Sequence, residues 1–465
     1  MTETYLYLLA TTLFIFGIKG LSKVRSARNG NRLAAIGMMV AIVGALLEGQ
    51  VLSPLWIIVG VVVGGGIGAV LAARVPLTAM PELVAAFNGT GGAASAFVAL
   101  ASLVAMAQGT GVIADHVGIA PAVTLPITIL IGTATFTGSG VAYLKLTGKK
   151  MTHPVSGTAR HYVNAALALV LVLASVWMVA IASTNTTVTI AALTVLVISG
   201  ILGVLLVLPI GGADMPVVVA LLNSYSGVAA ATSGFVIGNS MLMVAGALVG
   251  ASGLILTKIM CKAMNRSLAN VLVGGIGDDA QAEDARDYGN IKETSPEEVA
   301  MLFDSATSVI MVPGYGLAVA QAQHVMRELG ELLEKRGANV RYAIHPVAGR
   351  MPGHMNVLLA EADVSYDKLY ELEKINSDFR NTDVVVVVGA NDVVNPAARE
   401  DPGSPIAGMP ILDVDDAQTV VVVKRSLSPG YAGIKNPLFD KTNCLMVFMD
   451  AKKALEDMVT EVKDL

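Results

Sequence analysis

The chain is divided into two parts of unlike composition. From Met1 to about Lys262 it is almost continuously apolar, and this stretch contains only five acidic residues. From about Asn290 onward charged residues are frequent, and short β-branched runs alternate with helical patterns. With 54% hydrophobic and 14% charged residues, the chain is too apolar to be one soluble domain. The sequence therefore predicts a polytopic membrane domain joined to a soluble α/β domain.

The apolar part contains nine stretches long enough to cross about 30 Å of hydrocarbon. We expect helical spans over Tyr5–Leu21, Leu33–Leu47, Pro54–Ala73, Glu82–Ala107, Pro121–Leu146, Tyr162–Ala182, Val188–Pro209, Pro216–Ile237 and Ser240–Met260. Lysine and arginine cluster after the first, third, fifth and ninth stretches. Because cytoplasmic loops are enriched in these cations, the N-terminus is predicted outside and the C-terminal domain in the cytoplasm. Cys261 and Cys444 form no metal-binding or disulfide pattern, so no metal site is predicted.

Three polar residues of the apolar part are candidates for a proton path: Asp214, Asn223 and Asn88. Asp214 is predicted at the cytoplasmic end of a span, and Asn223 lies about 13 Å deeper at about 1.5 Å per residue. Asn88 lies about 9 Å deeper than Glu82 by the same measure. Polar groups at such depths face the interior of a helix bundle. There they either hold helices together or hydrogen-bond waters that carry protons.

The soluble part is predicted to be a Rossmann-like, doubly wound parallel sheet. We place the membrane domain at residues 1–265, a polar linker at 266–294 and the soluble domain at 295–465. Continuous valine-rich runs suit strands buried on both faces. The expected strands are Ser308–Pro313, Val340–Pro346, Val384–Ala390, Thr419–Arg425 and Leu445–Ala451.

A glycine-rich turn follows the first expected strand. Gly314 and Gly316 precede a predicted helix over Leu317–Glu334, and Ala320 stands where a small residue lets helix and strand pack closely. In a dinucleotide fold such glycines permit a tight turn and let backbone amides approach a pyrophosphate at a helix N-terminus. The alternative is a glycine-rich turn that serves packing alone.

Cations rather than an acid stand at the ends of the second and fourth strands. A fold that binds NAD would end its second strand with an acid for the ribose 2′-hydroxyl, but this strand contains Arg341 and His345 and is followed by Arg350. Lys424 and Arg425 close the fourth strand, where they suit a 2′-phosphate, although such a pair can also be a solvated strand end. The pattern favours NADP over NAD.

Two further residues lie in loops at strand ends. Asp392 closely follows a strand of five valines, so it either forms an Asx turn or presents a carboxylate to the cofactor. Tyr431 stands between Gly430 and Gly433, where its ring could cover a bound nucleotide.

Several segments resemble the beta subunit of the proton-translocating NAD(P) transhydrogenase along the whole chain. They are MPELVA (Met80–Ala85), IGGADMPVVV (Ile210–Val219), LNSYSG (Leu222–Gly227), MCKAMNRS (Met260–Ser267), PGYGLAVAQAQ (Pro313–Gln323), HPVAGRMPGHMNVLLAEA (His345–Ala362), GANDVVNPAA (Gly389–Ala398), IAGMP (Ile406–Pro410) and GYAGIKNPLF (Gly430–Phe439).

The resemblance implies that this chain binds NADP(H) and forms part of a membrane proton path. It implies that a separate alpha subunit, or subunits, binds NAD(H) and faces this chain for direct hydride transfer. The implied assembly is a dimer of heteromers in the bacterial inner (plasma) membrane, in contact with lipid and without nucleic acid. Some relatives carry a histidine after MPELVA that is implicated in proton transfer, and this chain has Asn88 there. A partner subunit could supply that histidine.

The resemblance also implies a set of cofactor-binding residues at the positions that match the family's motifs. They are Gly314, Tyr315, Gly316, Val347, Ala348, Gly349, Arg350, Met351, Pro352, Gly389, Ala390, Asn391, Asp392, Val393, Lys424, Arg425, Ser426, Gly430, Tyr431, Asp450 and Ala451. Two other functions remain open from the residues alone. One is a transporter or channel regulated by an NADP-sensing domain, and the other is a membrane-tethered dehydrogenase.

Overall fold

The computed structural model describes residues 2–21, 24–47, 54–106, 118–149, 151, 159–273, 288–351, 353–430 and 432–465. By its internal contacts the chain divides into two compact units. The first comprises Met1–Ile210 and Val217–Thr257, and the second comprises Gly211–Pro216 and Lys258–Leu465.

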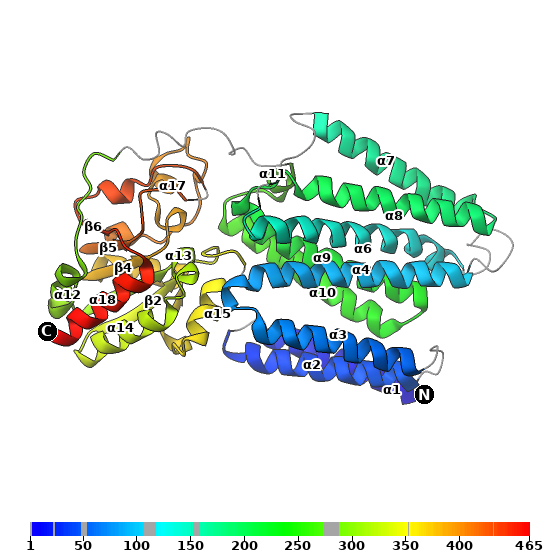
Figure 1. The fold of residues 1–465 in the computed structure, drawn as a ribbon, viewed down its shortest axis with the longest axis horizontal. Coiled ribbons are helices and arrows are strands. Elements are labelled where there is room, and N and C mark those ends of the chain that lie inside the picture. Colours follow the sequence, from blue (N-terminus) through cyan, green and yellow to red (C-terminus); the bar gives the residue numbers. More distant parts are fainter. Residues whose placement is uncertain are drawn as a thin grey trace. The chain divides into compact units, whose positions relative to one another are not determined.

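Long apolar helices make up the first unit (Figure 1). They are α1 (Thr2–Leu21), α2 (Val24–Leu47), α3 (Pro54–Arg74), α4 (Met80–Met106), α6 (Ile119–Leu146), α7 (Ala159–Ala180), α8 (Asn185–Val207), α9 (Met215–Ile237) and α10 (Ser240–Ala263). Within the described residues, nine helices are long and apolar enough to cross a membrane, which confirms the predicted helical membrane domain. The second begins at Val24 rather than at Leu33, because the arginine-rich stretch before Leu33 continues the helix.

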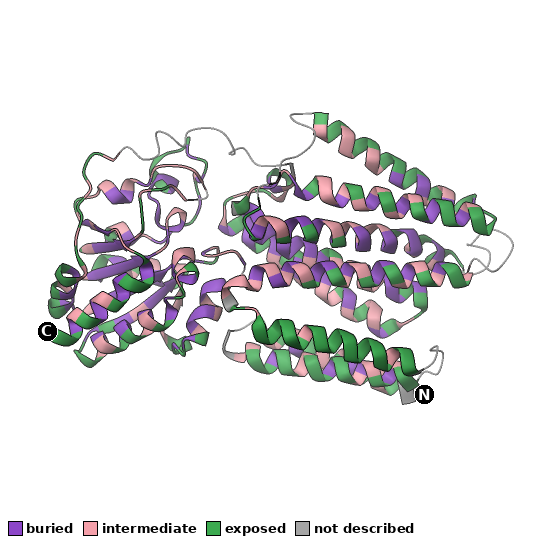
Figure 2. Ribbon diagram, in the orientation of Figure 1, coloured by how far each residue is buried: buried purple, intermediate pink, exposed green. Residues whose placement is uncertain are grey.

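Glycines allow several of these helices to pack with their backbones in contact. A Cβ atom on Gly92 of α4 would lie 2.6 Å from the carbonyl oxygen of Gly132 on α6. A Cβ atom on Gly253 of α10 would lie 2.8 Å from the Cα of Ser224 on α9. Small residues at such crossings let apolar helices approach closely in lipid. The glycines of α3 differ, since a Cβ atom on Gly64 would meet no described atom within 4 Å, and α3 is largely exposed in Figure 2.

A six-stranded parallel sheet forms the centre of the second unit. Its order is β3-β2-β1-β4-β5-β6, and its strands are β1 (Ser308–Pro313), β2 (Asn339–Ile344), β3 (Leu369–Glu371), β4 (Val384–Val388), β5 (Thr419–Val423) and β6 (Cys444–Val447). All five predicted strands are present, and the doubly wound class is confirmed. The valines of β4 are fully buried on both faces, as their continuous run predicted.

Most connections between strands contain helices, and short helical turns occur throughout. The helices of this unit are α11 (Leu268–Val273), α12 (Pro296–Ser305), α13 (Tyr315–Val319), α14 (Gln323–Lys335), α15 (His354–Glu361), α16 (Leu372–Ile375), α17 (Ala397–Glu400) and α18 (Ala451–Asp464). The single helix predicted over Leu317–Glu334 was wrong. Gln321 adopts a φ of +51°, which ends α13 and separates it from α14.

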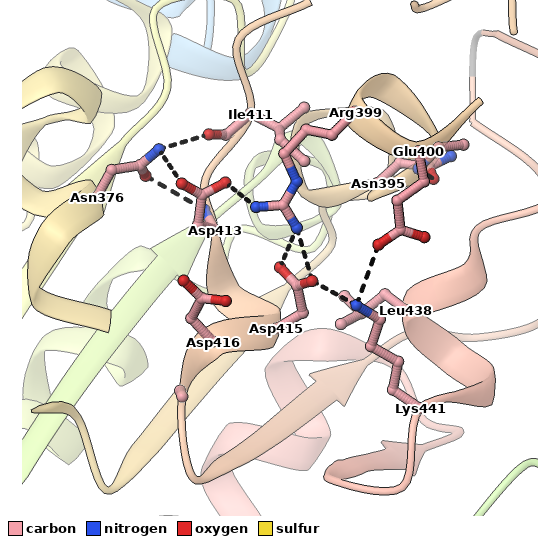
Figure 3. A network of polar contacts seen from close by, with 12 residues as sticks. Asn376, Asn395, Arg399, Glu400, Ile411, Asp413, Asp415, Asp416, Leu438 and Lys441 are labelled. Atoms are coloured by element: carbon pink, nitrogen blue, oxygen red, sulfur yellow. Dashed lines mark hydrogen bonds and ion pairs between the residues drawn. The ribbon is translucent and has the colours of Figure 1, made fainter. Parts of the chain in front are cut away.

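The connection from β4 to β5 is irregular, and its longest helix is the four-residue α17. A network of polar contacts holds it in place (Figure 3). Arg399 of α17 makes two contacts to the carboxylate of Asp415, at 2.9 and 2.7 Å, and also pairs with Asp413. Asn376 donates to the carbonyl oxygen of Ile411 at 2.9 Å. Side chains therefore supply the hydrogen bonds that a crossover helix would otherwise make internally.

Candidate functional site

The turns that follow β1 and β4 cross each other at three glycines. The amide of Gly314 donates to the carbonyl oxygen of Val388 at 2.9 Å, and the amide of Gly316 donates to that of Gly389 at 2.9 Å. A Cβ atom on Gly316 would lie 2.6 Å from the Cα of Gly389, and Gly389 has a φ of +67°. Neither position therefore accommodates a side chain. The amides of Gly314 and Gly316 bond within the protein and are not presented to a ligand, contrary to our expectation.

A cavity of about 600 Å³ opens beside this crossing, at the carboxyl ends of the strands. It lies next to β1 and β4, where the strand order changes direction. In doubly wound sheets this switch point is where ligands bind. Loops that follow β1, β2, β4, β5 and β6 line the cavity together with Gly212, Met264 and Arg266, so segments far apart in the sequence meet there.

Most of the residues predicted for a cofactor site line this cavity. They are Gly314, Tyr315, Gly316, Ala320, Val347, Ala348, Gly349, Gly389, Ala390, Asn391, Asp392, Val393, Lys424, Arg425, Ser426, Gly430, Asp450 and Ala451. Arg350 and Met351 are not among the lining residues. Pro352 and Tyr431 lie outside the described residues.

Ala320 was expected to pack between helix and strand, but its neighbours Ala318 and Ala322 are the alanines that the protein buries. Ala318 and Ala322 are fully buried, whereas Ala320 is half-buried at the end of α13. With five residues, α13 is also too short to contribute a substantial helix dipole.

Lys424 and Asn391 form a donor-rich part of the cavity wall. Burial lowers the pKa of Lys424 to about 8, although the nearby carboxylate of Asp392 acts to raise it. Asn436 Nδ2 lies 2.9 Å from one end of the Asn391 side-chain amide. Gly430 N and Lys424 Nζ lie 2.7 and 3.1 Å from its other end. The side-chain oxygen of Asn391 can accept from Gly430 and Lys424 at one end or from Asn436 Nδ2 at the other.

Asp392 holds the turn that follows Gly430. Its Oδ2 accepts a hydrogen bond from the amide of Ala432 at 3.0 Å. A Cβ atom on Gly430 would lie 2.3 Å from Asp392 Oδ1, so only glycine fits over this carboxylate. Asp392 therefore connects the loop after β4 to the loop after β5.

The loop after β2 contains Arg350, which lies against Tyr315 of α13, and two buried histidines stand on either side of it in the sequence. The guanidinium of Arg350 lies 4.4 Å from the centre of the Tyr315 ring. His354 Nδ1 accepts from the amide of Arg350 at 3.1 Å, and burial together with the charge of Arg350 lowers the pKa of His354 to about 4. Burial likewise lowers the pKa of His345 to about 4, although its hydrogen bond to Pro410 acts to raise it. Both rings are therefore neutral at pH 7, and neither can serve as a cation for a phosphate.

Arg341 lies within β2, as predicted, and it pairs with Asp378, so it is not among the cations that line the cavity. Sequence reasoning also missed Pro405, Ile406 and Met409 as lining residues. They belong to the irregular β4–β5 connection, which His345 Nε2 reaches by a hydrogen bond to the carbonyl oxygen of Pro410 at 2.7 Å. Their glycine- and proline-rich surroundings were the available signal.

The candidate membrane residues have specific partners. Asp214 is 2% exposed, and Arg266 Nη1 lies 2.8 Å from its Oδ2. Burial raises the pKa of Asp214, and the charge of Arg266 and their hydrogen bond partly offset that rise. Asn88 is buried and donates to the carbonyl oxygen of Val219 on α9 at 3.2 Å. Asn223 is half-buried and lies four residues further along α9, one helical turn from that carbonyl.

Known proteins are similar to this chain along nearly its whole length. The family model described as NAD(P) transhydrogenase beta subunit matches residues 3–461. Two relatives, both named NAD(P) transhydrogenase subunit beta, come from Rhodospirillum rubrum, one of them from a specified strain of that species. Each is 50% identical to this chain over 458 residues, which are 97% of this chain and 97% of the relative. This chain therefore belongs to the family of NAD(P) transhydrogenase beta subunits.

Proposed function

We propose that the cavity at the carboxyl edge of the sheet binds NADP(H). The observation that carries this proposal is the meeting of five strand-end loops at the β1/β4 switch point, in a chain of the transhydrogenase family. Dinucleotides bind at this place in doubly wound sheets. The cavity volume of about 600 Å³ also falls within the range of about 300–1,000 Å³ that small-molecule sites occupy.

The charges around the cavity favour NADP(H) over NAD(H). Lys424 and Arg425 follow β5 at the cavity wall, and β2 ends without an acid that could accept from a ribose 2′-hydroxyl. Arginine and lysine donors suit a 2′-phosphate through charge-assisted hydrogen bonds. The bound nicotinamide supplies the hydride chemistry. The residues of this chain bind and orient the nucleotide, and Asp392 holds the Gly430–Ala432 turn against it.

A partner completes the enzyme in this proposal. A transhydrogenase beta subunit requires an alpha subunit, and we propose that the alpha subunit binds NAD(H) and faces the NADP(H) cavity for direct hydride transfer. The complex is then a dimer of heteromers in lipid. We place it in the bacterial inner membrane, with the N-terminus of this chain outside and residues 295–465 in the cytoplasm, as the distribution of lysine and arginine favours.

We also propose that Asp214, Asn223 and Asn88 belong to the proton path. The support is the burial of Asp214, its pairing with Arg266 and the contact of Asn88 with α9. A buried carboxyl group with a raised pKa can exchange protons nearer to neutral pH than an exposed one. Protonation there would bias the Asp392 and Tyr431 loops between tight and open states for NADP(H). Coupling of this kind acts in both directions, so a proton gradient would favour NADPH formation.

Reconstitution tests the proposal directly. The purified chain should bind NADP(H), and in vesicles with an NAD-binding alpha subunit it should support hydride transfer from NADH to thio-NADP⁺. Absence of transfer in a complex that binds both nucleotides would contradict the enzyme and leave the NADP-sensing transporter as the better function. Asp392→Asn should change NADP(H) affinity and its pH dependence, and an unchanged profile would reduce Asp392 to a turn residue.

A further inference from the structure

The chain from Tyr288 to Thr294 extends the sheet at its β6 edge. The amide of Met446 donates to the carbonyl oxygen of Lys292 at 2.7 Å, and the amide of Thr294 donates to that of Met446 at 2.9 Å. These bonds form a parallel bridge beside β6. Lys292 Nζ adds a hydrogen bond to the carbonyl oxygen of Thr442 at 2.6 Å. The end of the predicted linker is therefore paired with the sheet.

Tyr288, at the start of this segment, contacts the loop between β5 and β6. Its hydroxyl oxygen accepts a hydrogen bond from the amide of Asn436 at 3.1 Å. Its ring centre lies 5.7 Å from that of Phe439, and Lys435 Nζ lies 4.8 Å from the Tyr288 ring centre. Tyr288 and Ile291 both pack against the buried core of the sheet.

Two of the residues that Tyr288 contacts, Asn436 and Phe439, are fully buried, and each touches a residue of the cavity wall. Asn436 Nδ2 donates to the backbone carbonyl oxygen of Asn391 at 3.2 Å. The ring of Phe439 lies beneath Lys424, whose Nζ is 5.0 Å from the ring centre. Asn391 and Lys424 both line the cavity. Asn436 thus connects Tyr288 to Asn391, and Phe439 connects it to Lys424, so only one residue separates Tyr288 from the cavity wall in each case.

We infer that Tyr288 is a positioning residue for the NADP(H) site, through which the segment at the end of the predicted linker sets the placement of Asn391 and Lys424. The inference rests on the proposed NADP(H) function of the cavity. Tyr288 is not among the cavity-lining residues, so it acts through the residues that it contacts, Asn436, Phe439 and Lys435. Displacement of the segment would release the Asn436 amide and loosen the wall that carries the donors for the phosphate.

Tyr288→Phe isolates this role, because it removes the acceptor for Asn436 and keeps the ring against Phe439. In the full chain assembled with its alpha subunit, we expect the dissociation constant for NADPH, measured by its fluorescence, to rise about tenfold, as for one lost hydrogen bond. The KM for NADP⁺ should rise with it, while the KM for NADH on the partner stays unchanged. A purely structural role would lower the melting temperature and leave both KM values unchanged.

Ile291→Val is the matched control, since it trims the same segment's packing without touching Asn436. It should leave NADPH affinity within about twofold of wild type. Lys435→Gln is the second variant and decides the matter if Tyr288→Phe does not fold. It removes the cation over the Tyr288 ring, and we expect the affinity for NADPH to be about threefold weaker than that of the wild type.

The outcomes separate this inference from the function on which it rests. Wild-type protein that fails to bind NADPH overturns the proposed function. Wild-type protein that binds NADPH, with Tyr288→Phe binding it equally well, overturns the positioning role alone.

Discussion

Asp415 offers the sharpest test of how the irregular β4–β5 connection is stabilised. Its side chain is 3% exposed, and its carboxylate receives two contacts from Arg399 and one from Lys441 (Figure 3). Asp415→Asn keeps the shape and removes the charge. Removing one partner of a buried ion pair costs about 3–5 kcal/mol, but these cations are 37% and 32% exposed, so water compensates part of the loss. We therefore expect a loss of about 2 kcal/mol.

The size of this effect can be measured against a matched control in the same network. Glu400 contacts Lys441 at 3.4 Å and is 54% exposed, so Glu400→Gln should cost less than about 1 kcal/mol. Scanning calorimetry of the complex should show a fall of about 4–8 °C in the unfolding of the soluble domain for Asp415→Asn. Hydrogen exchange should become faster in Ala397–Asp416. If Asp415→Asn and Glu400→Gln lowered the unfolding temperature equally, the contacts of Asp415 with Arg399 and Lys441 would not dominate the stability of this connection.

The pH dependence gives an independent check on Asp415. Burial alone would raise its pKa, but the hydrogen bonds and charges of Lys441 and Arg399 outweigh burial and hold the pKa below its usual value. A carboxylate with a depressed pKa in the folded state contributes stability above its unfolded pKa, which is about 3.9, and loses it as the pH falls through the folded value. The difference between wild type and Asp415→Asn should therefore be largest near neutral pH and shrink below about pH 4.

Three further substitutions test the cavity and the buried membrane-side pair. Gly316→Ala places a Cβ 2.6 Å from the Cα of Gly389, so it should cost about 1–3 kcal/mol and weaken NADP(H) binding, as titration would show. Because the pKa of Lys424 is about 8, its ammonium is lost above that pH. The dissociation constant for NADP⁺ should then rise between pH 8 and 9.5, and Lys424→Arg should flatten that rise. Arg266→Gln removes the charge that lowers the pKa of Asp214, so the pH profile of transhydrogenation in vesicles should shift to higher pH; an unmoved profile would exclude Asp214 from the proton path.

Helices and strands were predicted correctly where they produce a long, continuous apolar run in the sequence. The nine apolar stretches were recognisable because crossing a bilayer needs a long apolar run, and five of the six strands because burial on both faces of a sheet imposes a continuous one. β3 was missed because its three residues, Leu369–Glu371, present no such run. The break at Gln321 was missed because nothing local forbids a helix there. Its positive φ belongs to a helix-ending turn in which the amides of Gln321 and Ala322 donate to the carbonyl oxygens of Ala318 and Leu317, both at 3.1 Å.

The site was predictable only as far as the sheet is regular. Parallel strands end at one edge, so residues directly after β1, β4 and β5 had to meet, and they do. Arg341 was grouped with the cations near the second strand, and the sequence could not show that it pairs with Asp378. Ile406 and Met409 could not be placed, since their path depends on distant contacts such as that of His345 with Pro410.

The irregular connections after β4 and β5 also support the proposed positioning of the cavity wall from the β6 edge. A crossover helix holds itself through bonds between its own backbone groups, and so it resists displacement at any single residue. Here the side chains of single buried asparagines supply such hydrogen bonds. Asn395 accepts from the backbone amide of Ala397 and donates to the carbonyl oxygen of Lys435. Asn436 donates to the carbonyl oxygen of Asn391 and accepts from the backbone amide of Leu438. Losing one such amide frees a whole loop, so a small change at the β6 edge can reach the cavity. Such walls suit the proposed change between tight and open states for NADP(H).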